Sequence, residues 1–164
     1  MNYATIKRYD IANAPFVNTT IFFSGCLFKC EGCFNKIAQN FDYGKEFNKE
    51  AEDMFLSYVS DENVKGACIL GGEPFQQDLN ILLNFLKRIK EETGKPIWLW
   101  SGYTFEELIK DDLKLDILSY IDVLIDGQFE IAKRDLTLKY RGSSNQRVID
   151  VKKSLLTKEV VLKY

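Results

Sequence analysis

The sequence predicts an α/β protein in the form of an incomplete parallel (β/α) barrel. Short apolar runs alternate with longer amphipathic stretches, a pattern typical of parallel strands joined by crossover helices. A closed eight-stranded barrel needs about 250 residues, whereas this chain has 164. The composition is 46% hydrophobic and 28% charged, and no linker-like segment divides the chain. We therefore expect one domain over residues 1–164.

Five apolar runs are expected to form the strands. Most of them end in glycine or another small residue, as strands that enter a tight loop often do. The runs are NTTIFFSG (18–25), GACILGG (66–72), PIWLWSG (96–102), IDVLIDG (121–127) and QRVIDV (146–151).

Three amphipathic stretches between these runs are expected to be helices. They cover residues 46–60, 76–94 and 104–120. The second has a leucine-rich face, and Gly94 provides a stop signal. Its apolar positions recur at helical spacing: Leu79, Leu82, Leu83, Leu86 and Ile89.

The composition excludes several classes of function. There are 22 Lys and Arg against 24 Asp and Glu, a net charge of -2, whereas nucleic-acid-binding proteins show a basic excess. The chain has no histidine, which excludes Ser-His-Asp and Cys-His catalysis. The N-terminus does not resemble a signal peptide, and no eighteen apolar residues run together. We therefore expect a cytoplasmic protein that binds neither nucleic acid nor membrane.

Four glycine-containing loops follow the first four expected strands. They are the cysteine stretch (25–35), GGEP (71–74), SGY (101–103) and DGQF (126–129). Ligands of parallel sheets and barrels bind at the carboxyl ends of the strands, and glycine lets the backbone approach a ligand closely. We expect the four loops to form one ligand site.

Three of the four cysteines lie in one stretch, GCLFKCEGCFN, as Cys26, Cys30 and Cys33. In a reducing compartment, clustered cysteines are metal ligands or redox groups more often than disulfides. Structural zinc takes four ligands and would have to recruit Cys68, which its apolar strand places in the core. A four-iron cluster held by three thiolates would leave one iron free for a substrate or cofactor. We favour the cluster, with zinc and plain thiols as alternatives.

The motifs together resemble the radical S-adenosylmethionine superfamily, whose members combine Cys-x3-Cys-x2-Cys with a Gly-Gly-Glu-Pro turn. The stretches GCLFKCEGCFN, GGEPFQQ, WSGYTFEEL, DVLIDGQF and RGSSNQRVID are similar to the activating component of the anaerobic (class III) ribonucleotide reductase. The similarity runs from about residue 15 to about residue 151. RGSSNQR together with DGQF selects this family, and the activases of pyruvate formate-lyase are generally longer.

The resemblance implies that Cys26, Cys30 and Cys33 hold a 4Fe-4S cluster whose fourth iron is chelated by S-adenosylmethionine. Reductive cleavage would yield methionine and a 5'-deoxyadenosyl radical. That radical would abstract a hydrogen from a glycine of the large subunit of anaerobic ribonucleotide reductase. An external electron donor such as flavodoxin would be required.

The resemblance also implies cofactor contacts on two of the loops. Gly71, Gly72, Glu73 and Pro74 match the turn that receives the methionine ammonium group, although Glu73 could instead cap the following helix. Gly32 stands where many members of the superfamily carry an aromatic residue.

We therefore expect adenine to meet the backbone of Gly32, Cys33 and Phe34, with core packing as the alternative for Phe34. Ser101 is a candidate for ribose or carboxylate binding, and Asp126 for ribose or methionine binding. The alternatives are an ordinary turn serine and a turn-forming Asp-Gly pair.

The polar stretch KYRGSSNQR (139–147) is expected to be a solvated loop, and the resemblance makes it a partner-docking or substrate-side loop. We assign no catalytic role to Arg141 or Arg147. Other functions stay open. The chain could activate another glycyl-radical enzyme, act on a small molecule as short deazaguanine synthases do, carry electrons like a ferredoxin, or be a zinc-binding interaction module.

Overall fold

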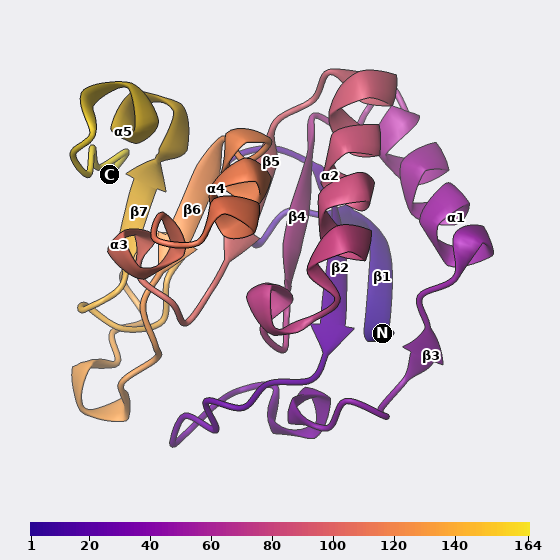
Figure 1. Cartoon of the computed structure of the whole chain (residues 1–164). Helices are drawn as coiled ribbons and strands as arrows, with labels where there is room; N and C mark the ends of the chain where they lie inside the picture. Colours follow the sequence, from indigo (N-terminus) through magenta and orange to yellow (C-terminus); the bar gives the residue numbers. More distant parts are fainter.

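The computed structural model describes residues 1–164 and contains one sheet of seven strands, in the order β3-β1-β2-β4-β5-β6-β7 (Figure 1). The four central strands, β2, β4, β5 and β6, are parallel. The strands are β1 (Asn2–Asp10), β2 (Asn18–Ser24), β3 (Lys45–Glu46), β4 (Gly66–Gly71), β5 (Ile97–Trp100), β6 (Val123–Asp126) and β7 (Arg147–Asp150).

The strands at the two sides of the sheet are antiparallel to their neighbours. β1 runs antiparallel to β2 and β3, and β7 runs antiparallel to β6. The α/β class is confirmed, but the all-parallel arrangement expected from the sequence is wrong, and the sheet is mixed and mostly open. The physical reason at β7 is that residues 127–146 contain only the short 3-10 helix η3 (Ile131–Lys133). A parallel pairing would need a longer crossover, usually a helix.

The helices are α1 (Lys49–Ser60), α2 (Leu79–Thr93), α3 (Phe105–Leu108), α4 (Asp112–Ser119) and α5 (Val151–Thr157). The expected helix over 104–120 is therefore two helices, because Asp111 accepts a hydrogen bond from the Lys114 amide and starts a new one. The expected end of α2 is confirmed, since Gly94 adopts the left-handed conformation with φ of 65°. Neither β1 nor α5 was expected from the sequence.

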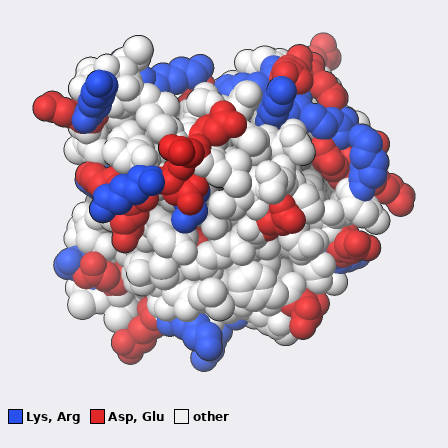
Figure 2. Space-filling model, in the orientation of Figure 1, with Lys and Arg blue, Asp and Glu red and all other residues white.

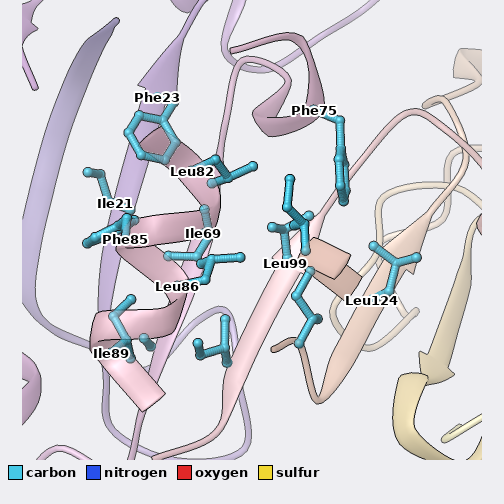
Figure 3. Close-up of a cluster of buried hydrophobic side chains, with 14 of the residues drawn as sticks. Ile21, Phe23, Ile69, Phe75, Leu82, Phe85, Leu86, Ile89, Leu99 and Leu124 are labelled. Atoms are coloured by element: carbon cyan, nitrogen blue, oxygen red, sulfur yellow. The ribbon is translucent and has the colours of Figure 1, made fainter. Parts of the chain in front are cut away.

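The helices bury their apolar faces against one side of the sheet. The larger core joins residues of the strands to residues of all five helices. Figure 3 shows Ile21, Phe23 and Ile69 of the strands facing Leu82, Phe85 and Leu86 of α2. The smaller core, on the opposite side, contains no helical residue. Its members are Ala14, Phe22, Cys68, Leu70, Trp98, Val123, Ile125 and Val148.

The parallel direction of β2, β4, β5 and β6 places the loops at their carboxyl ends together at one edge of the sheet (Figure 1). The 3-10 helices η1 (Lys36–Gln39) and η2 (Pro74–Gln76) belong to two of these loops. None of the helices is long and apolar enough to cross a membrane.

Phe85 of α2 is the centre of an aromatic cluster in the larger core. Its ring packs edge to face against Phe47 at 4.9 Å, Phe55 at 5.1 Å and Phe23 at 6.2 Å between centroids. Truncation of a buried phenylalanine removes its transfer free energy and leaves a cavity. We expect Phe85→Ala to lower the free energy of unfolding by about 3–5 kcal/mol in urea titration.

The matched control is Leu156→Ala, because Leu156 is 84% exposed on α5. A surface change of this kind should alter the free energy of unfolding by less than about 0.5 kcal/mol. Equal losses for the two variants would contradict the core described here.

Candidate functional site

The cysteine stretch forms a compact loop that begins where β2 ends. Gly25 turns the chain with φ of 106°, and its amide donates to the Ala38 carbonyl at 2.7 Å. The next amide, of Cys26, donates to the Gln39 carbonyl at 3.0 Å, so the loop is fastened to η1. A tight turn joins the Cys33 amide to the Cys30 carbonyl at 3.2 Å. The backbone therefore holds the three cysteines in one short structure.

The thiols of Cys26, Cys30 and Cys33 are free and half-buried. Burial raises the pKa of the Cys26 thiol and the pKa of the Cys30 thiol above the ordinary value. These two thiols are therefore protonated at neutral pH in the free protein. Metal binding would displace the protons, since the thiolate is the ligand.

Cys68 is fully buried in the smaller core, where it pairs in register with Thr20 of β2. Burial raises the pKa of the Cys68 thiol well above its ordinary value. The interpretation of Cys68 as a small core residue is confirmed. It lies in the middle of β4, whereas the other three cysteines follow the end of β2.

The GGEP loop lies directly against the start of the cysteine loop. The Gly72 amide donates to the Phe23 carbonyl at 2.6 Å, and the Glu73 amide donates to the Gly25 carbonyl at 2.8 Å. A Cβ atom on Gly72 would lie 2.2 Å from the Gly25 oxygen, so no side chain fits there. Gly71, with φ of 114°, turns the strand into this loop. Pro74 follows as the first residue of η2.

The carboxylate of Glu73 is buried and joins the GGEP loop to the SGY loop. Its Oε1 atom accepts hydrogen bonds from the Phe75 amide at 3.0 Å and from Ser101 Oγ at 2.9 Å. Its Oε2 atom accepts from the Gly102 amide at 2.6 Å. The helix-capping alternative for Glu73 is thus observed, together with a contact to Ser101 that the sequence did not predict.

Burial raises the pKa of Glu73 to about 7, although the Gly102 and Phe75 amides and the Ser101 hydroxyl oppose the shift. The cause is the loss of water around the charged carboxylate. Ser101 is also buried, and its Oγ atom accepts a hydrogen bond from the Tyr103 amide at 3.0 Å.

The SGY loop also packs on the cysteine loop. The rings of Phe28 and Tyr103 meet edge to face with centroids 4.8 Å apart. A Cβ atom on Gly102 would lie 2.5 Å from the Phe28 ring, so glycine is needed for this approach. The third loop of the expected site is therefore in place beside the cysteines.

The DGQF loop and the residues after it contact the cysteine loop at Cys30 and Gly32. The Cys30 thiol lies 4.0 Å from Oε1 of Gln128. Gly32 has φ of 72°, and a Cβ atom there would lie 2.7 Å from the Ile131 side chain and 3.5 Å from the Phe129 ring. The segment that follows DGQF thus fills the space that a side chain at position 32 would take.

Phe34 is 85% exposed. The core-packing alternative for this residue is therefore wrong. Its side chain lines a shallow hollow of about 140 Å³ with Ala4, Thr5, Lys7, Phe22 and Asn35.

Asp126 is buried at the end of β6, and both of its carboxylate oxygens are engaged. Arg147 Nε donates to Oδ1 at 2.9 Å, and the Phe105 amide donates to Oδ2 at 2.8 Å. The same arginine reaches Glu106 of α3 with two further hydrogen bonds. These carboxylates raise the pKa of Arg147. Asp126 and Arg147 therefore join β6, β7 and α3.

The RGSSNQR segment is a loop with mostly exposed or half-buried residues, as expected, and it is also bound to the DGQF loop. Asn145 Nδ2 donates to the Gln128 carbonyl at 2.8 Å, and Gln146 Nε2 donates to the Gly127 carbonyl at 2.9 Å. A Cβ atom on Gly142 would lie 3.0 Å from the Phe129 ring. The two motifs that selected the family in the sequence are in direct contact.

A protein-family model described as "4Fe-4S single cluster domain" matches residues 13–149. Curated relatives named anaerobic ribonucleoside-triphosphate reductase-activating protein match most of the chain. The relative from Pasteurella multocida is 43% identical over 89% of this chain and 95% of its own length. The relative from Escherichia coli is 38% identical over 90% and 97%. The relative from Enterobacteria phage T4 is 36% identical over 90% and 93%.

The chain belongs to this family. Membership makes an iron-sulfur cluster its cofactor, and the donor set of the site fits that group. Each thiolate of a four-iron cluster binds a different iron, so three free thiols on one loop need not converge on a single point. No three Cys, Asp or Glu side chains converge closely enough to hold a single metal ion. A structural zinc site with four ligands would require Cys68, which the sheet keeps in the core.

We expect Glu73 to make the stability of the cofactor-free protein depend on pH. Its folded-state pKa of about 7 exceeds the ordinary value of 4.5, so the folded chain keeps a proton that the unfolded chain has lost. The free energy of unfolding should fall by about 3 kcal/mol as pH rises from about 4.5 to about 7. Above about pH 7, the contribution of Glu73 should no longer change with pH.

Glu73→Gln removes the titrating group and should remove this component. The test is urea unfolding of both proteins at pH 5 and pH 8, comparing the change between the two pH values. The comparison cancels any constant loss from the altered hydrogen bonds. An unchanged pH dependence in Glu73→Gln would show that Glu73 does not carry the proton.

Proposed function

We propose that this protein activates anaerobic ribonucleoside-triphosphate reductase by forming a glycyl radical on its large subunit. The observation that carries the proposal is the loop of three free cysteines at the sheet edge, in a chain whose relatives bear that name. When bound, the 4Fe-4S cluster supplies an electron that cleaves S-adenosylmethionine, and the resulting 5'-deoxyadenosyl radical takes a hydrogen atom from a glycine of the reductase.

Cys26, Cys30 and Cys33 are the proposed ligands of the cluster. The three thiolates would bind three of the irons, which would leave the fourth iron for the amino and carboxylate groups of S-adenosylmethionine. The backbone hydrogen bonds between this loop and η1 support this role, because they fix the loop that carries the three thiols. Pre-organised ligands also keep the sulfonium close to the electron source.

Gly71, Gly72, Glu73 and Pro74 are proposed to receive the methionine ammonium group. The Glu73 carboxylate is buried and already accepts three hydrogen bonds, which favours direct contact through the backbone carbonyls of the loop. Glu73 would then contribute without touching the ammonium group. Its hydrogen bonds would fix the loop, and its negative charge, when ionised, would attract the ammonium group. Ser101, bound to Glu73, would support the same loop in addition to any contact with the ribose or carboxylate.

The adenine is proposed to lie along the backbone of Gly32, Cys33 and Phe34. The exposed Phe34 ring beside the helix-free side of the sheet favours this arrangement. For Asp126, whose oxygens are engaged by Arg147 and Phe105, we infer that any contribution to ribose or methionine binding is made through the position of the DGQF loop.

The open sheet is proposed to serve as the wall of an incomplete barrel. Helices cover one side, non-helical segments cover the smaller core on the other, and the four loops meet at the carboxyl ends of the parallel strands, where a peptide segment of the reductase would approach. Exclusion of water and oxygen by the docked partner would protect the radical. The electron would come from an external carrier such as flavodoxin.

Anaerobic reconstitution with iron and sulfide tests the proposal. We expect a brown protein with about four irons per chain, which forms 5'-deoxyadenosine from S-adenosylmethionine and dithionite. Addition of the reductase should give a glycyl doublet in electron paramagnetic resonance. Formation of 5'-deoxyadenosine without a doublet would contradict the target, and absence of both would contradict the reaction.

Substitution of the cysteines one at a time separates ligands from core residues. Ser at position 26, 30 or 33 should lower bound iron to a small fraction of the unchanged protein, because a cluster ligand is lost. Cys68→Ser should retain the full iron content and lose some stability, because a hydroxyl enters an apolar core. Bleaching of Cys68→Ser, with the fold intact by circular dichroism, would overturn the three-ligand assignment.

A further inference from the structure

The outer side of the cysteine loop exposes apolar side chains beside the half-buried thiols. Leu27 is 67% exposed and follows Cys26 directly, and Ile37 on η1 is 61% exposed. The backbone hydrogen bonds from Gly25 to Ala38 and from Cys26 to Gln39 keep the segments of these two residues together. Figure 2 shows a broad uncharged area over the lower part of this face, with a group of Lys or Arg atoms and, to its left, Asp or Glu atoms at the lower margin, where Figure 1 draws the cysteine loop. Large apolar side chains left in water on one loop are typical of a surface that another protein covers.

The charge at this place is opposite in sign to that of the chain. The segment 26–39 has two lysines, Lys29 and Lys36, and one acid, Glu31, in a chain of net charge -2. Both lysines are exposed, and neither forms an ion pair within the chain. Their charges are therefore free to pair with a partner.

The function proposed above requires that an electron reach the cluster, and the cysteine loop is the part of the chain through which it would enter. The thiolates of Cys26, Cys30 and Cys33 would hold the cluster on this loop, and the substrate would bind at the iron that has no protein ligand. An electron that enters without crossing the substrate must come through the cysteine loop. Because electron transfer weakens steeply with distance, the donor has to dock where the loop meets solvent.

We propose that Leu27, Lys29, Lys36 and Ile37, the cysteine-loop surface, form the docking site for an acidic one-electron carrier protein. The apolar side chains supply the desolvated centre of a small interface, and the two lysines attract and orient the acidic carrier. In the docked pair the carrier loses one electron and the cysteine-bound group gains it. No bond forms or breaks, and no proton is required. The reductase would use the opposite, substrate-facing side.

Charge reversal tests the proposal, with reduced flavodoxin as the carrier. Under anaerobic conditions, the double variant Lys29→Glu, Lys36→Glu should be reduced by flavodoxin at least about 10-fold more slowly at low ionic strength. The readout is the loss of visible absorbance in stopped flow. The Kd of the complex should rise by a similar factor, and both differences should shrink in about 0.5 M salt.

Two controls accompany the charge reversal. Reduction by dithionite, a small molecule that needs no docking site, should stay within about twofold of the unchanged protein, because the variant leaves all three cysteines in place. Lys87→Glu on α2, another exposed lysine, should leave the flavodoxin rate unchanged. The milder pair Lys29→Gln, Lys36→Gln should give an intermediate loss.

Three outcomes would overturn the assignment of the docking site. The flavodoxin rate could be unaffected in both double variants, or it could fall only in parallel with the dithionite rate. Weaker binding of the reductase at an unchanged flavodoxin rate would assign the surface to the reductase instead. Failure of the proposed function is distinguishable, because the unchanged protein would then form no 5'-deoxyadenosine even with dithionite.

Discussion

The site depends on the close approach of two backbone segments, the end of β2 and the loop after β4. The Gly25 carbonyl accepts hydrogen bonds from the Glu73 amide and from the Gln77 side chain, at 2.8 and 3.1 Å. This contact is possible only because Gly72 has no side chain in the space that the Gly25 oxygen occupies. It places the GGEP loop against the cysteine loop, and Glu73 then holds the SGY loop in turn.

The strand directions account for the architecture around this contact. Parallel pairing of β2, β4, β5 and β6 brings the four loops to one edge, and the helices pack on one side only. The antiparallel β7 returns RGSSNQR to the DGQF loop, which lies against Gly32 and Cys30. The loops thus support one another around the thiols, while the other side of the sheet stays free of helices.

Local features of this arrangement could be predicted from the sequence. The cysteine spacing, the glycines at strand ends and the Gly94 helix stop act over a few residues, and the structure places them as expected. Long-range contacts could not. Nothing in the sequence pairs Glu73 with Ser101, or Asp126 with Arg147, because hydrogen-bond partners 28 or 21 residues apart depend on how the strands are ordered. The direction of β7 was also missed, because side chains alternate with the same two-residue period in parallel and antiparallel strands.

We propose that the chain supplies three ligands to the cluster and leaves one iron for S-adenosylmethionine. Electron-nuclear double resonance on the reduced, anaerobic protein tests it most directly, with S-adenosylmethionine whose amino nitrogen is a heavy isotope. We expect a hyperfine coupling between that nitrogen and the cluster, which disappears when the labelled compound is omitted. A cluster with no such coupling, or one in which every iron has a protein ligand, would show that S-adenosylmethionine does not bind at a free iron.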